Sequence, residues 1–502
     1  MSTTVSGRLH RDRTAAAAPA PRRDAVGWAW LALCALGFLG LCLLARRFVT
    51  DDSWITARYA ENLARGDGFV WNPEGPRAEG SSNPLLVALE AVGTLAGVAS
   101  VDLARAIGVA CGLALLLVIH RLGREAIGVV GARVALAVTA FYAPVALWAV
   151  GGLETLPVAL ALTAGVLLAC LRRAGRAGAA VAALPWLRPE GLVVALAVAI
   201  AAEGPGLVRG PDRRGAARRL AAVAGLPVLS QAALEALRLG VYGHWLPNSV
   251  LYKAGTGAPL DVLERFLRQG NGKFLLVVAA CGLLVARGRQ RLLAVPFLVY
   301  AAGSIGVLDS VNSFSRFFLP VWPLLALLAG LAVAAVLRPL PARPALLATA
   351  LLGLAWAHSA FETGSDVHRF ADRYAACPQA ARLDAAEWLR ANTAPGSAFT
   401  ISDAGLVPAQ AGGRRAFDQL GLNEAMIQRT GPLPAWRRAS LALAARPEAL
   451  LLLSRDPERF SPKYAVDSAV TKDPRFRAYR LAHVARGEGC RYHLFVYQRA
   501  RP

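Results

Sequence analysis

Two adjacent carboxylates, Asp51 and Asp52, directly follow the first long apolar run of the sequence. A single aspartate at this place commonly caps a helix, a contribution worth about 1 kcal/mol. A cap needs only one residue, and charge at a membrane boundary is costly, so the pair favours a chemical role. A carboxylate can act as a general base toward a hydroxyl within hydrogen-bond reach, and burial or a second carboxylate raises its pKa toward neutrality. The sequence leaves open which aspartate would act.

The residues after the pair predict a short amphipathic helix on the membrane surface. Ile55, Tyr59 and Leu63 recur at a spacing of four, and Gly66 follows as a C-cap. Asp51 and Asp52 would then stand at the N-terminus of this helix. The first connection as a whole spans residues 46–84 and leads into the next apolar run.

Basic and acidic side chains in other connections could serve the same site. Each of four basic residues could neutralise a phosphate, and the planar fork of arginine suits phosphate oxygens especially well; they are Arg58, Arg188, Lys253 and Arg316. Snorkelling or contact with phospholipid headgroups is the alternative for each of them. Glu154 and Glu190 stand at helix ends, where a carboxylate is a functional candidate, although a salt bridge to Arg188 is equally simple. His244 is expected to form hydrogen bonds rather than to bind a metal.

The composition identifies the elements that must position these residues. The chain has 502 residues, of which 55% are hydrophobic and 18% charged, with a net charge of +22 and a mean hydropathy of +0.43. It is too apolar for a soluble nucleic-acid binder, and longer than the roughly 250–300 residues at which single soluble cores stop growing. Disorder and a small disulfide scaffold are also excluded. These values predict a polytopic membrane protein.

Apolar runs and arginine-rich connections give the expected topology. The run 25–45 is long enough to span a bilayer, and five arginines in the tail 1–24 place the N-terminus in the cytoplasm. With the runs after it we expect about eleven membrane helices within residues 25–361. The run 85–99 is short enough to be a half-span, and the run 179–202 is broken by Pro185 and Pro189. The further runs lie at 85–99, 103–119, 127–150, 156–171, 179–202, 220–239, 274–286, 292–308, 318–337 and 345–360.

Residues 362–502 contain no spanning run and predict a small α/β domain outside the cytoplasm. We expect a helix at 380–391 and strands at 398–402, 449–454, 476–485 and 491–499. Cys377 and Cys490 both lie in this domain, and an oxidising compartment would permit a disulfide, although spacing alone does not show that they meet. The other five cysteines lie in apolar runs and are expected to be packing residues.

The loop sequence DDSWITARYAENLARGDGFVWNPEG, followed by AEGSSNPL, resembles the first periplasmic loop of GT-C fold glycosyltransferases that use polyprenyl-phosphate sugars. The resemblance is strongest to the group containing the mycobacterial terminal β-arabinofuranosyltransferase and a related flagellar-motor control protein, and it covers most of the chain. The later segments that agree in order are Gly152-Leu153-Glu154-Thr155, Arg188-Pro189-Glu190-Gly191, the run from Tyr242 to Ser249, Asp403-Ala404-Gly405 and the run from Phe417 to Leu422.

This resemblance implies a site and a reaction. Asp51 and Asp52 would be catalytic, and Arg58, Arg188, Lys253 and Arg316 would bind the donor phosphate. The implied reaction is an inverting transfer of a sugar, with a pentose such as arabinofuranose as one candidate, to a cell-envelope glycan or glycolipid in the bacterial inner membrane. The candidate substrate-binding residues are Tyr59, Asn62, Glu79, Asn83, Glu154, Glu190, His244 and Asn248.

No cofactor is required by this chemistry, although the two aspartates could hold a divalent cation such as Mg²⁺ or Mn²⁺. No zinc-ligand spacing, nucleotide-binding glycine loop or Ser/His/Asp order is present, which agrees with a lipid-linked donor. Ser53-Trp54 and Ser81-Ser82-Asn83 depart from the usual family pattern, so the sugar stays open. A non-enzymatic scaffold is the main alternative, because one relative has such a role. A transporter is less favoured, because the apolar runs are largely free of charge.

Overall fold

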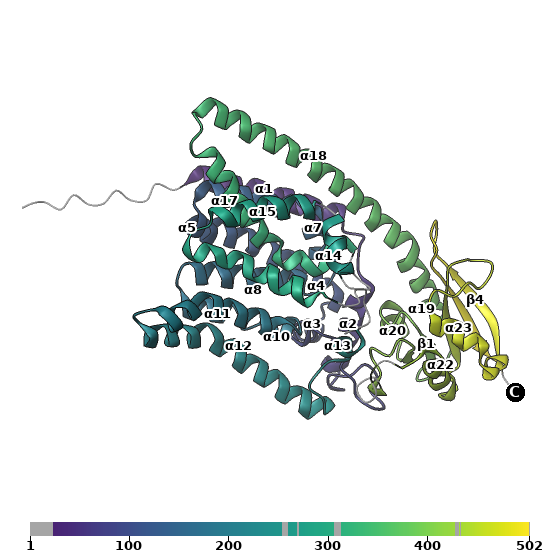
Figure 1. Ribbon diagram of the computed structural model, residues 1–502. Helices are drawn as coiled ribbons and strands as arrows, with labels where there is room; N and C mark the ends of the chain where they lie inside the picture. Colours follow the sequence, from purple (N-terminus) through teal and green to yellow (C-terminus); the bar gives the residue numbers. More distant parts are fainter. Residues whose placement is uncertain are drawn as a thin grey trace, which may run out of the picture.

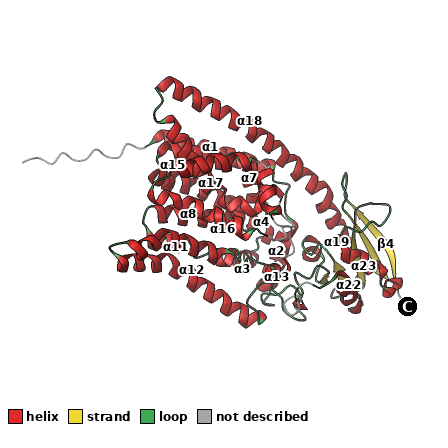
Figure 2. Cartoon of the chain, viewed as in Figure 1, coloured by secondary structure: helices red, strands yellow, loops and turns green. Residues whose placement is uncertain are grey.

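The computed structural model describes residues 24–253, 260–268, 271–305, 313–426, 431 and 433–500. The chain forms a helical bundle that is followed by a smaller domain at one end of it (Figure 1). Strands occur only in this C-terminal domain, while the described part of the bundle is helical (Figure 2). The predicted mostly helical membrane fold with a small C-terminal α/β domain is confirmed at this level.

Eighteen labelled helices precede the C-terminal domain in the described residues. They are α1 (Ala25–Leu44), α2 (Asp51–Ala64), α3 (Pro84–Leu95), α4 (Ser100–Val118), α5 (Arg124–Ile127), α6 (Val129–Ala140), α7 (Ala143–Val150), α8 (Thr155–Cys170), α9 (Ala174–Val181), α10 (Leu184–Leu187), α11 (Gly191–Arg209), α12 (Arg213–Tyr242), α13 (Asn248–Lys253), α14 (Asp261–Arg268), α15 (Gly272–Val285), α16 (Val295–Gly303), α17 (Trp322–Leu337) and α18 (Ala342–Tyr374). A π-helical turn at Ile119–Gly123 and 3₁₀ segments at Gly288–Ala294 and Ser313–Val321 connect some of them.

Several of these helices are long and apolar enough to cross a bilayer. Six pass this test among the described residues, and a seventh span results if α6 and α7, which are bent by 56°, are taken together. Three shorter apolar helices, α3, α8 and α15, accompany them. The protein is therefore a multi-pass membrane protein, while the number of about eleven membrane helices stays a prediction.

The bundle departs from the predicted runs where proline or a short helix intervenes. The run 127–150 was expected as one span but is divided into α6 and α7. Pro144 lies in the first turn of α7; in a continuous helix it would have no N–H to donate to the carbonyl of Ala140, and its ring would clash with that carbonyl. The predicted break in the run 179–202 is confirmed by α9, α10 and α11. Helix α3 has 12 residues, about 18 Å at 1.5 Å per residue, which is short of a bilayer core.

The helix predicted after the aspartate pair is present as α2, while its place on the membrane surface stays a prediction. It begins at Asp51 and ends at Ala64, and Gly66 adopts a positive φ of 91° just beyond its end. Helix α18, which has 33 residues, was expected to end near Ala360 but continues to Tyr374, and it runs along the bundle into the C-terminal domain (Figure 1).

The C-terminal domain contains a five-stranded sheet in the order β2-β1-β3-β5-β4. Strand β1 pairs in parallel with β2 and β3, whereas β5 is antiparallel to both β3 and β4. The expected helix and four strands are present, but β2 was missed, because its four residues RAFD carry charge at both ends. The elements are α19 (Ala380–Asn392), β1 (Ala398–Ile401), α20 (Leu406–Gln410), β2 (Arg415–Asp418), α22 (Ala435–Ala444), β3 (Ala449–Ser454), α23 (Ala465–Lys472), β4 (Tyr479–Arg486) and β5 (His493–Arg499).

A disulfide joins Cys377 to Cys490, with the two Cα atoms 6.1 Å apart. Cys377 lies in the π-helical turn Ala375–Gln379 between α18 and α19, and Cys490 lies between β4 and β5. The bond therefore ties the last turn of the long helix to the far edge of the sheet, across a sequence separation of 113 residues. The pairing that spacing alone left open is thus present in the structure.

Replacing Cys377 and Cys490 together by serine should lower the stability of the C-terminal domain. Removing a native disulfide typically costs about 2–5 kcal/mol, because the unfolded chain gains the freedom that the bond removed. Thermal unfolding of the purified, non-reduced protein should show a lower midpoint for the double variant, whereas Cys281→Ser, an exposed free thiol, serves as the control. Equal midpoints for the double variant and the wild type would contradict this account.

Candidate functional site

A buried carboxylate, Glu154, holds two of the predicted arginines and an asparagine together. Its Oε1 accepts from Nε of Arg188 and from Nη2 of Arg316, each at 3.0 Å. Its Oε2 accepts from Nδ2 of Asn83 at 2.9 Å. The four residues lie far apart in the sequence, and Glu154 is only 3% exposed. A single carboxylate thus assembles the centre of a charged network.

Two further predicted carboxylates lie at the edges of this network. Nη1 of Arg316 is 3.9 Å from Oδ2 of Asp52, and Nη1 of Arg188 is 3.3 Å from Oε1 of Glu190. The side chains of Asp52 and Glu190 are each 32% exposed, compared with 4% for the side chain of Glu154. Solvent and ligands can therefore reach the two outer carboxylates but not the central one.

The ends of four helices place these residues. Asp52 lies in the first turn of α2, and Asn83, Glu154 and Glu190 immediately precede α3, α8 and α11. The N-terminus of a helix exposes unpaired N–H groups and carries a partial positive charge, so it favours anions. The network therefore lies where four helix N-termini converge, an environment suited to negative charge on a ligand.

Arg316 is presented by an unusual stretch of backbone. The two preceding residues, Phe314 and Ser315, adopt left-handed conformations with φ of 51° and 58°. Non-glycine residues in this region carry strain, and such residues cluster at functional sites. The guanidinium lies 5.2 Å from the centre of the Trp148 ring, and its buried Nε donates to no described residue. Among the described residues, the polar side chains that Arg316 contacts are therefore Glu154 and Asp52.

The electrostatics of Glu154 follow from this packing. Burial alone would raise its pKa, but the positive charges of Arg316 and Arg188 and the Asn83 hydrogen bond lower the pKa of Glu154 to about 2. Glu154 is therefore ionised at every physiological pH. Its permanent charge balances part of the charge of the two arginines that it holds.

Asp51 faces the C-terminal domain and not the network around Glu154. Its Oδ2 accepts from the backbone N–H of Gly405 at 3.1 Å, and its Oδ1 accepts from that of Leu406 at 2.9 Å. Nε of Arg382 lies 3.2 Å from Oδ1. The backbone N–H of Asp51 donates to the hydroxyl of Tyr374 at 3.0 Å. Asp51 therefore joins the first loop to the C-terminal domain, whereas Asp52 faces Arg316.

Burial raises the pKa of Asp51 to about 6, with Arg382 acting in the opposite direction and the nearby carboxylate of Asp403 reinforcing the rise. The carboxylate form, which pairs with Arg382, therefore predominates at neutral pH. The two oxygens of this carboxylate already accept hydrogen bonds from N–H groups beside a guanidinium. They are poorly placed to share a divalent cation with Asp52, so the aspartate pair does not fit a metal site. The described residues contain no group of three or more His, Cys, Asp or Glu side chains that could hold a metal ion.

Arg58 was expected to bind phosphate, but the structure uses its guanidinium to join the first loop to the C-terminal domain. Nε donates to the carbonyl of Trp71, Nη1 to that of Pro408, and Nη2 to that of Arg414. Nη2 also donates to Oδ1 of Asn72 at 3.1 Å. Each of its nitrogens is thus engaged within the protein, and the side chain is buried.

Tyr59 and Asn62, expected to bind substrate, are also engaged in holding the loop. The Tyr59 hydroxyl donates to the carbonyl of Ala78 at 2.8 Å and accepts from the N–H of Gly80 at 2.9 Å. Nδ2 of Asn62 donates to the carbonyls of Val70 and Trp71, at 2.7 and 3.0 Å. Both side chains are buried, with exposures of only 1%, and Tyr59 also lines a small pocket between the first loop and α12.

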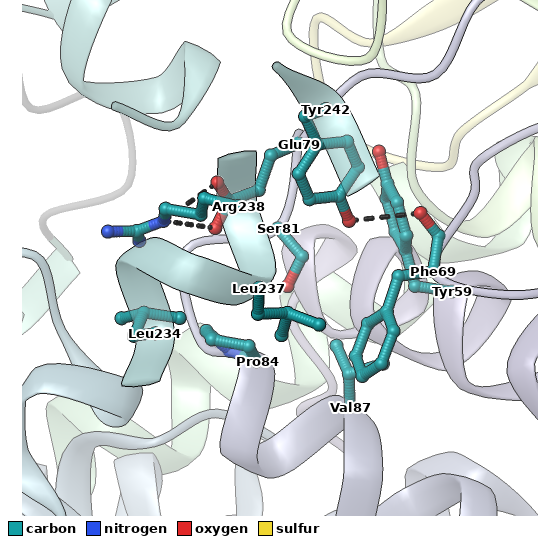
Figure 3. Close-up of a pocket in the computed structure, with 10 residues that line it drawn as sticks. All are labelled: Tyr59, Phe69, Glu79, Ser81, Pro84, Val87, Leu234, Leu237, Arg238 and Tyr242. Carbon is teal, nitrogen blue, oxygen red and sulfur yellow. Dashed lines mark hydrogen bonds and ion pairs between the residues drawn. The ribbon is translucent and has the colours of Figure 1, made fainter. Parts of the chain in front are cut away.

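Glu79 and Asn248 have similar structural roles in place of the expected substrate contacts. Glu79 accepts from Nε of Arg238 at 3.1 and 2.9 Å, beside the same small pocket (Figure 3). Nδ2 of Asn248 donates to the carbonyls of Leu422 and Glu424 in the C-terminal domain, at 3.0 and 2.9 Å. Each of these residues therefore supports the packing of the first loop or of the domain interface.

The two remaining predicted residues lie in the connection after α12. His244 is partly exposed in the turn between α12 and α13. Lys253 ends α13, and its side chain lies outside the described residues. The structure therefore adds no argument for either as a ligand of phosphate or sugar.

Sequence reasoning missed the residues that join the two domains. Arg382 lies in a predicted helix and Tyr374 beyond the last apolar run, and neither stands out from its neighbours by type or spacing. The Asp403-Ala404-Gly405 motif was the one available signal, because Asp403 and Gly405 both lie at this junction. Their partner Asp51 is more than 350 residues away in the sequence, so only the fold reveals the contact.

Comparisons with known proteins agree with this architecture. A family model described as a domain of unknown function (DUF8728) matches residues 371–497. No curated protein matches the chain by sequence. Among solved structures, the archaeal oligosaccharyltransferase AglB from Archaeoglobus fulgidus, in complex with an inhibitory peptide and a dolichol-phosphate, has a TM-score of 0.58 at 13% identity, covering 85% of this chain and 69% of that one.

ArnT from Cupriavidus metallidurans is similar over nearly its whole length. Its complex with undecaprenyl phosphate has a TM-score of 0.58 at 14% identity, covering 94% of this chain and 98% of that one, and its apo state has a TM-score of 0.60. Identities this low establish the fold alone. The predicted GT-C fold is therefore confirmed.

Replacing Glu154 by alanine should destabilise the protein strongly. The change would leave Arg188 and Arg316, whose side chains are 9% and 13% exposed, without their shared counter-charge. Removing one partner of a buried ion pair costs about 3–5 kcal/mol. Thermal unfolding of the detergent-solubilised protein should show a clearly lower midpoint.

Glu190→Ala is the matched control for this measurement. Glu190 is 32% exposed and contacts only Arg188 of the two arginines, so its removal should cost at most about 1 kcal/mol. Equal losses for the two variants would show that Glu154 is not the centre of the network.

Proposed function

We propose that this protein is an integral-membrane glycosyltransferase that moves a sugar from a polyprenyl-phosphate donor to a hydroxyl of a cell-envelope glycan or lipid. The observation that carries the proposal is the convergence of Asp52, Arg316, Glu154 and Arg188 at one end of the bundle. A proton acceptor there lies beside one arginine, and the carboxylate that holds this arginine also holds a second; a base and cations are the groups that transfer from a phosphate leaving group needs.

Asp52 is the proposed general base. One of its oxygens takes the proton of the acceptor hydroxyl while the hydroxyl oxygen attacks the anomeric carbon of the donor. The bond from that carbon to the phosphate oxygen breaks, and its electrons leave with the polyprenyl phosphate. Attack from the face opposite the leaving group inverts the configuration at the anomeric carbon.

The leaving phosphate is proposed to bind Arg316 and Arg188. The guanidinium of Arg316, whose Nη1 lies 3.9 Å from Oδ2 of Asp52, and the four helix N-termini supply donors and positive potential around the place where negative charge develops. Glu154 keeps the two guanidinium groups in fixed positions, so little rearrangement is needed when the phosphate arrives. Arginine neutralises the phosphate without a metal ion, in keeping with the poor fit of the aspartate pair to a cation.

The contacts favour Asp52 over Asp51 as the acting residue. Asp51 is only 13% exposed and is bound by Gly405, Leu406 and Arg382, whereas Asp52 is 32% exposed and faces Arg316. A base must reach the hydroxyl that it activates, which the engaged carboxylate cannot do without breaking the domain junction. The sequence left open which aspartate is the general base, and we propose Asp52.

The donor class is supported by what similar structures hold. ArnT was solved with undecaprenyl phosphate and AglB with a dolichol-phosphate and a peptide. A pentose such as arabinofuranose stays a candidate sugar, and the similarity to mycobacterial AftD, with a TM-score of 0.48, is too remote to narrow it. We further propose that the site and the C-terminal domain face the outside of the bacterial inner membrane, where the acceptor glycan lies.

Replacing Asp52 by asparagine should abolish sugar transfer. The amide keeps the size of the side chain but cannot accept the proton, and the loss of a general base costs about 10²–10⁴-fold in rate. The measurement is transfer by purified protein in nanodiscs, supplied with a panel of polyprenyl-phosphate sugars and envelope glycan. Asp67→Asn, which removes an exposed partner of Arg65 on the same loop, is the control and should retain full activity.

The growth of cells that carry Asp52→Asn distinguishes an enzyme from a non-enzymatic scaffold. A scaffold needs the fold but no proton acceptor, so an Asp52→Asn strain would grow and assemble its envelope as the wild type does. Loss of cellular function together with normal protein abundance supports the enzyme. Transfer by Asp52→Asn at the wild-type rate would rule out the proposed base.

A further inference from the structure

Arg382 occupies the junction between the first loop and the C-terminal domain. It lies on α19 and is 6% exposed. Its Nε is 3.2 Å from Oδ1 of Asp51, and its Nη2 donates to Oδ2 of Asp403 at 2.8 Å. Its Nη1 donates to the hydroxyl of Tyr374 at 3.1 Å. One buried cation therefore bridges a carboxylate of the first loop and a carboxylate of the C-terminal domain.

The C-terminal domain holds its side of this bridge firmly. The hydroxyls of Tyr464 and Tyr492 donate to the two oxygens of Asp403, at 3.0 and 2.6 Å. The Arg382 guanidinium lies 4.6 Å from the centre of the Tyr492 ring. Because Asp403 lies two residues beyond the end of β1, the bridge is anchored at the carboxyl end of an interior strand that pairs in parallel with both of its neighbours.

The other side of the bridge is the first residue of α2. Asp51 is fixed through its backbone N–H by Tyr374 and through its carboxylate by Arg382, Gly405 and Leu406. The approach at Gly405 is so close that a Cβ atom there would lie 2.1 Å from the carbonyl oxygen of Asp51. Four contacts on one residue leave the first turn of the helix little freedom.

Asp52, the proposed general base, is the next residue in that turn. The position of Asp51 at the domain junction therefore affects the position of the base. A general base has to hold its oxygen within hydrogen-bond distance of the acceptor hydroxyl, and a displacement of about 1 Å can cost 10²-fold in rate. We infer that Arg382 is a positioning residue for sugar transfer: by fixing Asp51 it sets the first turn of α2 and so the place of Asp52. The inference rests on the proposed function.

Other contacts across the same interface make the inference testable, because they should keep the domain docked when Arg382 is changed. Arg58 donates to the carbonyls of Pro408 and Arg414, and Nδ2 of Asn72 donates to the carbonyl of Ala416 at 2.9 Å. The loss of Arg382 should therefore loosen the start of α2 without releasing the domain. The C-terminal domain then acts as a part of the active site in addition to any role in holding the acceptor.

The test compares Arg382→Gln, Arg382→Lys and Asp51→Asn in the full-length protein in nanodiscs, with undecaprenyl-phosphate sugar as the donor. Arg382→Gln should lower kcat by about tenfold or more with little change in the KM for the donor, because the phosphate ligands are untouched. Arg382→Lys should recover part of the loss. The double variant Asp51→Asn, Arg382→Gln should be no slower than the slower single variant, because both remove the same contact.

Arg415→Gln is the matched control, because it removes an exposed arginine that pairs with Glu74 across the same interface, 3.6 Å away. It should leave kcat unchanged. Hydrogen–deuterium exchange gives a readout that is independent of activity: the amides at the start of α2 should exchange faster in Arg382→Gln, while those of β1 and β3 should not.

The outcomes separate the inference from the proposed function. If the wild type transfers no sugar from any donor of this class, the proposed function fails. If the wild type is active and Asp52→Asn is not, but Arg382→Gln matches the wild type in kcat, the positioning role is refuted. Unchanged exchange at the start of α2 refutes it as well. If Arg382→Gln does not fold, Arg382→Lys and Gly405→Ala test the same junction, and wild-type kcat and exchange in both variants overturn the inference.

Discussion

The candidate site depends on the burial of one carboxylate between two arginines. A guanidinium cannot be buried near a membrane without a counter-charge, and Glu154 supplies one to Arg188 and Arg316 at once. To do so it brings together the turn before α8, the break between α10 and α11, and the segment before α17, while Asn83 connects the first loop to the same carboxylate. The position of Asp52 depends on this packing, because Asp52 lies at the exposed edge of the network, beside Arg316. Moving Arg316 would break its buried ion pair with Glu154, which costs free energy.

The two adjacent aspartates contact different parts of the protein. Asp51 turns toward the C-terminal domain and accepts from the amides at the start of α20, while Asp52 turns toward Arg316. The C-terminal domain packs against the first loop through a buried apolar cluster that includes Ile55, Trp71 and Val407, and through polar contacts at the same junction. The polar contacts come from Arg58, Asn72 and Asn248 as well as from Asp51. The predicted ligands Arg58, Asn248 and Asp51 thus contact the C-terminal domain, while Tyr59 and Asn62 hold the first loop.

The sequence predicted the elements better than the roles of the residues. Apolar runs and prolines located the bundle helices, the break at Pro185 and Pro189 and the helix α2 after the aspartate pair, because these depend on local composition. It did not predict the bend between α6 and α7 or the short strand β2, whose signals are weak. A salt bridge from Glu154 or Glu190 to Arg188 was one of the alternatives that the sequence offered, and both ion pairs are present. It was not predicted that Arg316 pairs with the same carboxylate, since an ion pair between residues more than 160 positions apart has no local signature.

The central claim is that the phosphate of the donor binds between Arg188 and Arg316 beside Asp52. A cryo-EM structure of the full-length protein with undecaprenyl phosphate tests it most directly. The account predicts a phosphate oxygen within about 2.7–3.2 Å of a nitrogen of Arg316 or Arg188, with the Asp52 carboxylate facing the same space and Asp51 still bound to Arg382. A phosphate bound away from both arginines, for example in the pocket beside Arg238, would contradict it.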